Sequence, residues 1–237
     1  MIEKTLHYCW FGNDAKPPLV NKCITTWQKH MPDFELREWN ESNFDICVND
    51  FVRGAYEDKN FAFVSDYARA VALYTCGGIY LDTDVEVLKS LKPFLNARFF
   101  AGFEEGGFVG TCVMGAQKQL QLFEAYIEHY DQAAYRLPDG TKYKNTNVVL
   151  MTQLLEQRGF RRGDDYQERE GLLLFPRTYF SPYDYINGAQ YFSENSYAVH
   201  HFAQSWLPKS VRAKTKLKRA VAGIVGPKGV ALLRGRR

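Results

Sequence analysis

An apolar run at residues 79–88, IYLDTDVEVL, is interrupted by two aspartates, Asp82 and Asp84. The apolar residues on both sides predict a buried strand, where a carboxylate without a partner would be costly. Alternate side chains of an extended segment project to the same side, so these two can converge on one point. Paired carboxylates suit Mg²⁺ or Mn²⁺, which keep open positions for phosphate oxygens. A lone D-x-D is commonly a solvated turn, but the apolar surroundings favour a metal site here.

The segments before this run predict an α/β fold. Residues 4–11 (KTLHYCWF) and 34–40 (FELREWN) have strand patterns, and residues 19–30 between them have helical spacing. Such a β-α-β unit favours a parallel sheet with helices on its faces and ligands beyond the carboxyl ends of its strands. Residues 61–76 predict a further helix, with Gly77 as its cap. Later elements are expected as strands at 99–104, 109–116 and 172–176 and as helices at 118–130 and 146–160.

Size and charge divide the chain into a body and a tail. With 237 residues and 46% hydrophobic content, the chain can bury one sizeable core. The segment 209–237 holds ten of the 30 Lys and Arg and no acidic residue, which leaves 20 basic against 27 acidic residues in the rest. We therefore expect a globular domain at 1–208 and a basic, amphipathic tail at 209–237.

The N-terminus and the cysteines predict a cytoplasmic protein. The opening MIEKTLHYCWFG lacks the apolar stretch of a signal peptide, and no run of 18 apolar residues occurs elsewhere. The five cysteines show no metal-binding or redox spacing, which favours reduced thiols.

Asp66 and Arg69 lie three residues apart on the predicted helix at 61–76 and so share a face. One interpretation is an ordinary surface ion pair, which contributes little. The alanines at 62, 68, 70 and 72 instead suggest a helix packed closely on the sheet, from which Arg69 could offer its planar fork to a diphosphate or a sugar. The spacing alone leaves both interpretations open.

The run FAFVSDYARAVALYTCGGIYLDTDVEVLKSL, with TLHYCWFG before it and AVHHFAQSW after it, resembles glycosyltransferase family 32. Relatives in that group include bacterial capsule and lipopolysaccharide transferases, yeast Golgi mannosyltransferases and, more distantly, the glucosylating clostridial toxins. The likeness extends from Leu6 to about Trp206. It implies a GT-A fold, a Rossmann-like mixed sheet flanked by helices with a D-x-D metal site, and transfer with retention of anomeric configuration.

The resemblance also implies roles for individual residues. Asp82, Asp84 and Arg69 would carry catalysis, and His201 would join the two aspartates at the metal, although His200 is an equal candidate. Where relatives often carry Asn beside the donor, this chain has Gly110 and Thr111. Donor binding would involve Trp10, Ser65, Asp66, Arg69, Tyr80, Asp82, Ser205 and Trp206.

Trp10 follows the first predicted strand and precedes a loop that contains Gly12. An indole in that position offers a flat face for stacking on the nucleobase of a donor. The alternative is a tryptophan of the core.

Together these features predict a retaining, Mn²⁺- or Mg²⁺-dependent glycosyltransferase of surface polysaccharide synthesis. It would use a UDP- or GDP-sugar and a glycan or lipid-linked acceptor, and no nucleophilic carboxylate is identifiable. One alternative is a metal-dependent phosphohydrolase, which would need neither Trp10 nor Trp206. Another is a lipid- or nucleic-acid-binding protein that acts through its tail, although no nucleic-acid partner is expected. Apolar residues at helical spacing among the lysines of 209–237 suit anionic lipid and the inner membrane face.

Overall fold

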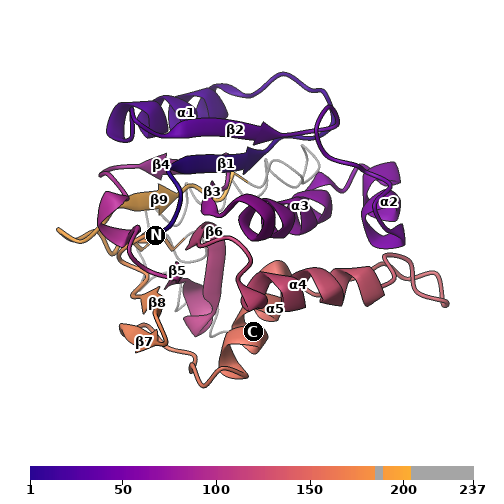
Figure 1. Cartoon of the computed structure of the whole chain (residues 1–237). Helices are drawn as coiled ribbons and strands as arrows, with labels where there is room; N and C mark the ends of the chain where they lie inside the picture. The colour runs from indigo at the N-terminus through magenta and orange to yellow at the C-terminus, as the bar shows by residue number, and fades with distance from the viewer. Residues whose placement is uncertain (185–188, 204–237) are drawn as a thin grey trace, which may run out of the picture.

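The computed structural model describes residues 1–184 and 189–203, and its centre is a seven-stranded mixed sheet (Figure 1). The strand order is β2-β1-β3-β6-β5-β8-β7, in which β1 pairs in parallel with both β2 and β3. Strand β6 is antiparallel to β3 and to β5, so β5 runs in the direction of β3. The α/β class and the mixed sheet are confirmed. The strands are β1 (Thr5–Cys9), β2 (Glu35–Trp39), β3 (Gly78–Leu81), β5 (Phe99–Phe103), β6 (Val109–Ala116), β7 (Gln167–Arg169) and β8 (Leu172–Phe175).

Five α-helices accompany this sheet in the described part of the chain. The expected helices at 118–130 and 146–160 are present with shifted bounds. Helix α2 was not expected from the sequence; Asn49 caps it by accepting a hydrogen bond from the Val52 N–H at 2.8 Å, and its apolar face is buried. The helices are α1 (Pro18–His30), α2 (Asp50–Glu57), α3 (Phe61–Cys76), α4 (Gln121–Gln132) and α5 (Asn147–Glu156), with 3₁₀ turns η1 (Lys92–Phe94) and η2 (Glu105–Gly107).

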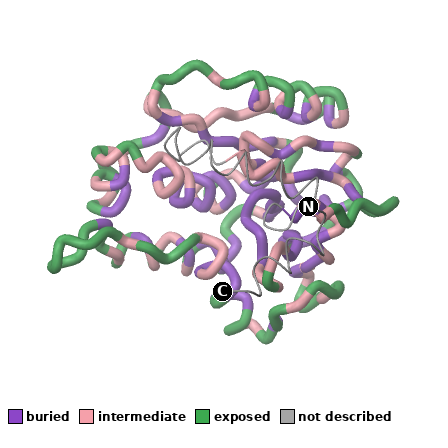
Figure 2. Tube along the Cα trace, turned by 180° about the vertical axis from the view of Figure 1, so that it is seen from behind, coloured by how far each residue is buried: buried purple, intermediate pink, exposed green. Residues whose placement is uncertain are grey.

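Two hydrophobic clusters pack on opposite faces of the sheet. Successive residues of β3 show this division, because Ile79 and Leu81 belong to one cluster and Tyr80 to the other. The larger cluster joins the sheet to α2, α3, α4 and α5, and the smaller one includes Trp27 of α1. Figure 2 shows the buried residues gathered around the sheet and the exposed ones along the outer helix surfaces and loops.

The turn from α3 into β3 fixes where the two aspartates lie. Gly77 and Gly78 both have positive φ, at 67° and 101°. A Cβ on Gly78 would lie 2.7 Å from the Thr5 carbonyl oxygen, so a larger residue would push β3 away from β1. The two glycines therefore let the chain leave a buried helix and enter β3, which ends immediately before Asp82.

A small second sheet closes over the end of β3. Strand β4 (Val85–Val87) pairs antiparallel with β9 (Ala198–His200), with Val85 opposite His200. This pairing brings residues far apart in the sequence to the D-x-D segment.

Residues 204–237 lie outside the described residues. The domain boundary expected at residue 208 and the basic tail at 209–237 fall in this range. No helix in the two described ranges combines the length and apolar character needed to cross a bilayer.

Candidate active site

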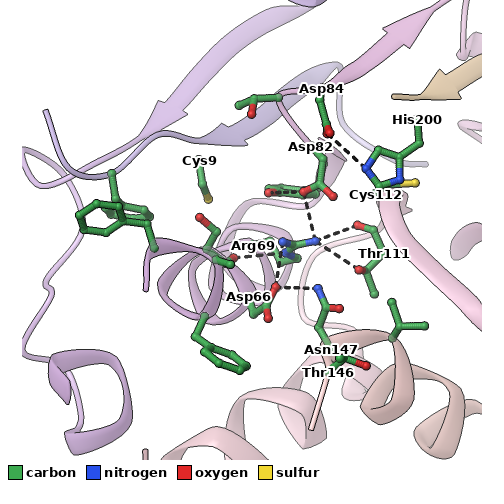
Figure 3. A pocket seen from close by; sticks show the side chains of 18 of the residues that line it. Cys9, Asp66, Arg69, Asp82, Asp84, Thr111, Cys112, Thr146, Asn147 and His200 are labelled. Atoms are coloured by element: carbon green, nitrogen blue, oxygen red, sulfur yellow. Dashed lines mark hydrogen bonds and ion pairs between the residues drawn. The ribbon is translucent and has the colours of Figure 1, made fainter. Parts of the chain in front are cut away.

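A cavity of about 440 Å³ lies at the sheet edge where β1, β3 and β5 end and β6 begins. This volume is in the usual range of small-molecule sites. Its walls include side chains from different parts of the chain, among them Trp10 and Glu104. Figure 3 shows Asp66, Asp82 and His200, which also come from three separate segments.

Asp82 and Asp84 converge in this cavity, with one oxygen of each within 4.8 Å of the other and of a His200 ring nitrogen. Asp82 follows β3, and its Oδ1 accepts a hydrogen bond from the Tyr80 hydroxyl at 3.0 Å. Asp84 precedes β4, and its Oδ2 accepts from the Ala203 N–H at 2.7 Å. Each carboxylate thus accepts a hydrogen bond, one from a residue of β3 and one from the segment after β9, and these contacts fix the direction of both.

Of the two histidines that the sequence left open, His200 lies with the two aspartates and His201 does not. The His200 Nε2 lies 3.2 Å from Asp84 Oδ1, whereas the His201 Nε2 lies 2.9 Å from Glu86 Oε2. Adjacent residues of an extended chain project to opposite sides, so only one of two neighbouring histidines can face the aspartates. The pairing of β4 with β9 selects His200.

Asp84 and His200 each stabilise the ionised form of the other. Burial would raise the pKa of Asp84, but the neighbouring His200 and the Ala203 N–H bring it down to about 2. Burial would likewise lower the pKa of His200, and the Asp84 carboxylate instead raises it well above its usual range. The other ring nitrogen of His200, Nδ1, is buried and has no hydrogen-bond partner in the described part of the chain.

Arg69 is buried, with only 5% of its side chain exposed. This excludes the surface ion pair that was one interpretation of the sequence. The Arg69 Nη2 lies 2.9 Å from Asp66 Oδ1 and its Nη1 lies 3.3 Å from Asp82 Oδ1. The same Nη1 donates to the Thr111 carbonyl oxygen at 3.1 Å, and Nε donates to the Ser65 carbonyl oxygen at 3.2 Å. The guanidinium therefore ties α3, β3 and β6 together beneath the cavity.

Asp66 has a second partner that the sequence did not indicate. The Asn147 side chain donates to Asp66 Oδ1 at 2.6 Å from the first turn of α5 (Figure 3). Burial raises the pKa of Asp66 to about 7, against the opposing effect of Arg69. Asn147 lies in a polar stretch far along the chain, and no pattern in the sequence linked it to α3.

The other expected donor-binding residues fall into three groups. Ser65 and the half-buried Trp10 line the cavity, and the Trp10 Nε1 donates to the Asp14 carbonyl oxygen at 2.7 Å. Tyr80 also lines it but is almost fully buried, with its ring 4.6 Å from the Arg69 guanidinium carbon, so it supports Arg69 and Asp82. Ser205 and Trp206 lie outside the described residues.

Part of the chain is similar to a known protein family. Residues 17–100 match the model of the family described as the glycosyltransferase sugar-binding region containing a DXD motif. Asp82 and Asp84 lie inside the match. Over these residues the chain is similar to the DXD glycosyltransferases. The family resemblance carried by the D-x-D segment is thereby confirmed.

A curated relative and two solved structures extend the comparison. The chain is 21% identical over 217 residues to inositol phosphoceramide mannosyltransferase 3 of Schizosaccharomyces pombe, an alignment that covers 85% of the chain and 60% of the relative. The structure of PaToxG glycosyltransferase superposes with a TM-score of 0.52 at 16% identity, covering 66% of this chain and 70% of that one. A glycosyltransferase involved in glycosylation of the major capsid of PBCV-1 has a TM-score of 0.50 at 11% identity, covering 92% and 98%. The GT-A fold is confirmed.

Proposed function

We propose that this chain transfers a sugar from a nucleotide-sugar donor, a UDP- or GDP-sugar, to a glycan or a lipid-linked acceptor. The observation that carries the proposal is the convergence of Asp82, Asp84 and His200 on one side of a cavity of ligand size. The two aspartates are the DXD of the matched segment. Fold alone would not support an activity, because one fold hosts many functions; the side chains at the site support it.

The cluster fits a divalent cation of the Mn²⁺ or Mg²⁺ type. Asp82, Asp84 and His200 would hold it, and three protein ligands leave positions of an octahedral shell for phosphate oxygens and water. Two carboxylates with an imidazole suit Mn²⁺ well. To bind the ion, His200 would give up the proton that its pairing with Asp84 favours, and the cation would replace that positive charge. When bound, such an ion stabilises the negative charge that develops on a leaving diphosphate.

The order of strands along the cavity supports one direction for the donor. Trp10 follows β1, the aspartates follow the neighbouring β3, and β6 and β5 continue beyond them. With the nucleobase on Trp10 and the diphosphate at Asp82 and Asp84, the sugar lies over β6 and β5. Asp66 and Arg69 form the floor between the diphosphate and the sugar.

For the reaction itself, we propose retention of configuration by front-face attack. In that route the leaving phosphate assists removal of the proton from the acceptor hydroxyl, and no protein nucleophile is needed. Surface polysaccharide synthesis would supply glycan acceptors. The name of the Schizosaccharomyces pombe relative adds mannose and an inositol phosphoceramide lipid to the substrates that should be tried.

The test is a panel of UDP- and GDP-sugars, each incubated with the purified chain, Mn²⁺ and either glycan or glycolipid acceptors. We expect release of nucleoside diphosphate from one donor, abolished by EDTA and accelerated by one acceptor class, which then gains the sugar in its mass spectrum. Release of nucleoside monophosphate and sugar 1-phosphate, at a rate that no acceptor changes, would favour the phosphohydrolase. No release from any donor would contradict the proposal.

Replacing Trp10 by Ala should weaken donor binding about tenfold, because stacking of an aromatic ring on a base contributes ~1–3 kcal/mol. Trp10 is only half-buried, so the fold should lose little stability. Titration calorimetry with UDP and GDP in Mn²⁺ measures the effect. Trp10→Phe, which keeps an aromatic face, is the matched control and should recover most of the affinity. Equal affinity of wild type and Trp10→Ala would contradict nucleobase stacking.

For the segment 209–237, which lies outside the described residues, we propose attachment to anionic membrane and a cytoplasmic location on the inner leaflet. Truncation after Pro208 should remove sedimentation with vesicles that contain phosphatidylserine, because the segment carries ten basic and no acidic residues. Vesicles of pure phosphatidylcholine are the control and should bind neither form. Equal binding to both vesicle types, or binding that survives truncation, would argue for a tail without this role.

A further inference from the structure

Glu104 is a carboxylate in the cavity that the roles described above do not use. It follows β5, and its main chain is fixed on both sides, since its N–H donates to the Phe108 carbonyl oxygen at 2.8 Å and its own carbonyl oxygen accepts from the Gly107 N–H at 3.1 Å. A Cβ on Gly110 would lie 3.1 Å from Glu104 Oε2. Gly110, which has no side chain, thus leaves room for this carboxylate.

The Glu104 side chain has neither a hydrogen-bond partner nor an ion-pair partner within residues 1–184 and 189–203. The cations in its neighbourhood are engaged by other acids. Arg177 Nη1 lies 2.7 Å from Oε2 of the adjacent Glu105, and His200 is paired with Asp84. Burial raises the pKa of Glu104; the charges of Asp82 and Glu105 act in the same direction, and those of His200 and Arg177 oppose it. The side chain is half-buried, and a carboxylate that is partly withdrawn from water without a hydrogen-bond partner is unfavourable.

The position of Glu104 along the sheet points to the occupant. Strands β1, β3 and β5 run in the same direction, so Trp10, Asp82 and Glu104 emerge at the same edge in that order. One strand, β6, separates β3 from β5, so β3 and β5 lie about 10 Å apart at the usual strand spacing. If the diphosphate lies at Asp82, the hydroxyl groups of the attached sugar extend toward Glu104.

Resting on the proposed function, we propose that Glu104 binds the transferred sugar by accepting a hydrogen bond from one of its hydroxyl groups. A sugar hydroxyl supplies the donor that the protein does not, and a hydrogen bond to a charged acceptor is stronger than one between neutral groups. Glu104 then helps to determine which sugar the enzyme accepts. Trp10 and the group Asp82, Asp84 and His200 would instead bind the nucleobase and the diphosphate, which all donors of one nucleotide share.

The experiment compares binding of nucleotide with binding of nucleotide sugar. Titration calorimetry in Mn²⁺ is carried out with UDP, GDP, UDP-glucose and GDP-mannose on wild type, Glu104→Gln and Glu104→Leu. For the donor that wild type binds, we expect Glu104→Gln to raise the Kd of the nucleotide sugar about tenfold and Glu104→Leu to raise it further. The Kd of the matching nucleoside diphosphate should not change, because that ligand lacks the sugar.

Glu105→Gln is the matched control, since it removes the adjacent carboxylate, which does not line the cavity. It should leave both Kd values unchanged. The melting temperature of Glu104→Gln should equal or exceed that of wild type, because a buried charge without a partner has been removed. A lower melting temperature, together with weaker binding of nucleotide and nucleotide sugar alike, would assign Glu104 a structural role.

Two further outcomes would overturn the proposal. Unchanged Kd values for the nucleotide sugar, together with a raised KM for the acceptor, would place Glu104 at the acceptor. A covalent sugar adduct on Glu104, detected in the intact mass of the protein, would make it a nucleophile. Failure of wild type to bind any of the four ligands in Mn²⁺ would overturn the proposed function and this role with it.

Discussion

Replacing Asp84 by Asn should reduce sugar transfer by about three orders of magnitude, the scale seen when one preorganised electrostatic contact to a transition state is removed. Asn keeps the size of Asp and can still accept the hydrogen bond from the Ala203 N–H. It lacks the charge that holds a divalent ion beside Asp82 and His200. Release of nucleoside diphosphate with and without Mn²⁺ measures the loss.

The fold of Asp84→Asn should survive, with a stability cost of about 2 kcal/mol at neutral pH. The pKa of Asp84 falls to about 2 in the folded chain, so folding favours its ionised form, and the stabilisation is present above the pKa of the unfolded chain and lost as the pH falls through the folded value. Repulsion between the two carboxylates acts in the opposite direction, but the ion pair of Asp84 with His200 outweighs it. Urea unfolding at pH 7 and at pH 3 measures the difference, which should be smaller at pH 3.

The matched control for this variant is Glu86→Gln. Glu86 lies two residues further on in β4 and pairs with Lys22 and His201, away from the metal cluster. The variant Glu86→Gln should transfer sugar at the wild-type rate. If Asp82→Asn and Asp84→Asn both transfer sugar at the wild-type rate, or if EDTA leaves the wild type unaffected, the metal-dependent mechanism is wrong.

Replacing Arg69 by Lys should lower the free energy of unfolding by about 3 kcal/mol. It should also slow sugar transfer. A lysine ammonium cannot reach Asp66, Asp82 and the Thr111 carbonyl oxygen at once, because it lacks the planar fork of a guanidinium. Asp82 would then lose a contact that orients it, and Asp66 would be left buried with Asn147 alone. Urea unfolding and steady-state kinetics are measured on the same preparations.

Arg53→Lys is the control for Arg69→Lys. Arg53 forms an exposed ion pair with Asp50 on α2, and exposed pairs contribute little. The free energy of unfolding of Arg53→Lys should remain within about 0.5 kcal/mol of the wild-type value. A variant Arg69→Lys that transfers slowly yet unfolds like wild type would mean that Arg69 acts mainly on the donor, as the sequence first suggested.

The parts of the site that the sequence predicted are local in the chain. Asp82 and Asp84 stand out because they interrupt an apolar strand, and Asp66 with Arg69 because helical spacing places them on one face. The choice between His200 and His201 depends on the register between β4 and β9, which no local pattern reveals. Glu104 and Asn147 escaped prediction for the same reason, since an acid at a strand end and an amide in a polar stretch are ordinary until the sheet and α5 bring them to the cavity.

The pairing of β4 with β9 also bears on when the site comes into existence. A polypeptide leaves the ribosome from its N-terminus, so β3, α3 and both aspartates are made while residue 200 is still to be added. Strand β9 is the last strand of the described chain, and it contributes His200. A nascent chain that ends before Ala198 carries the paired carboxylates but not His200, the third residue of the proposed cation site.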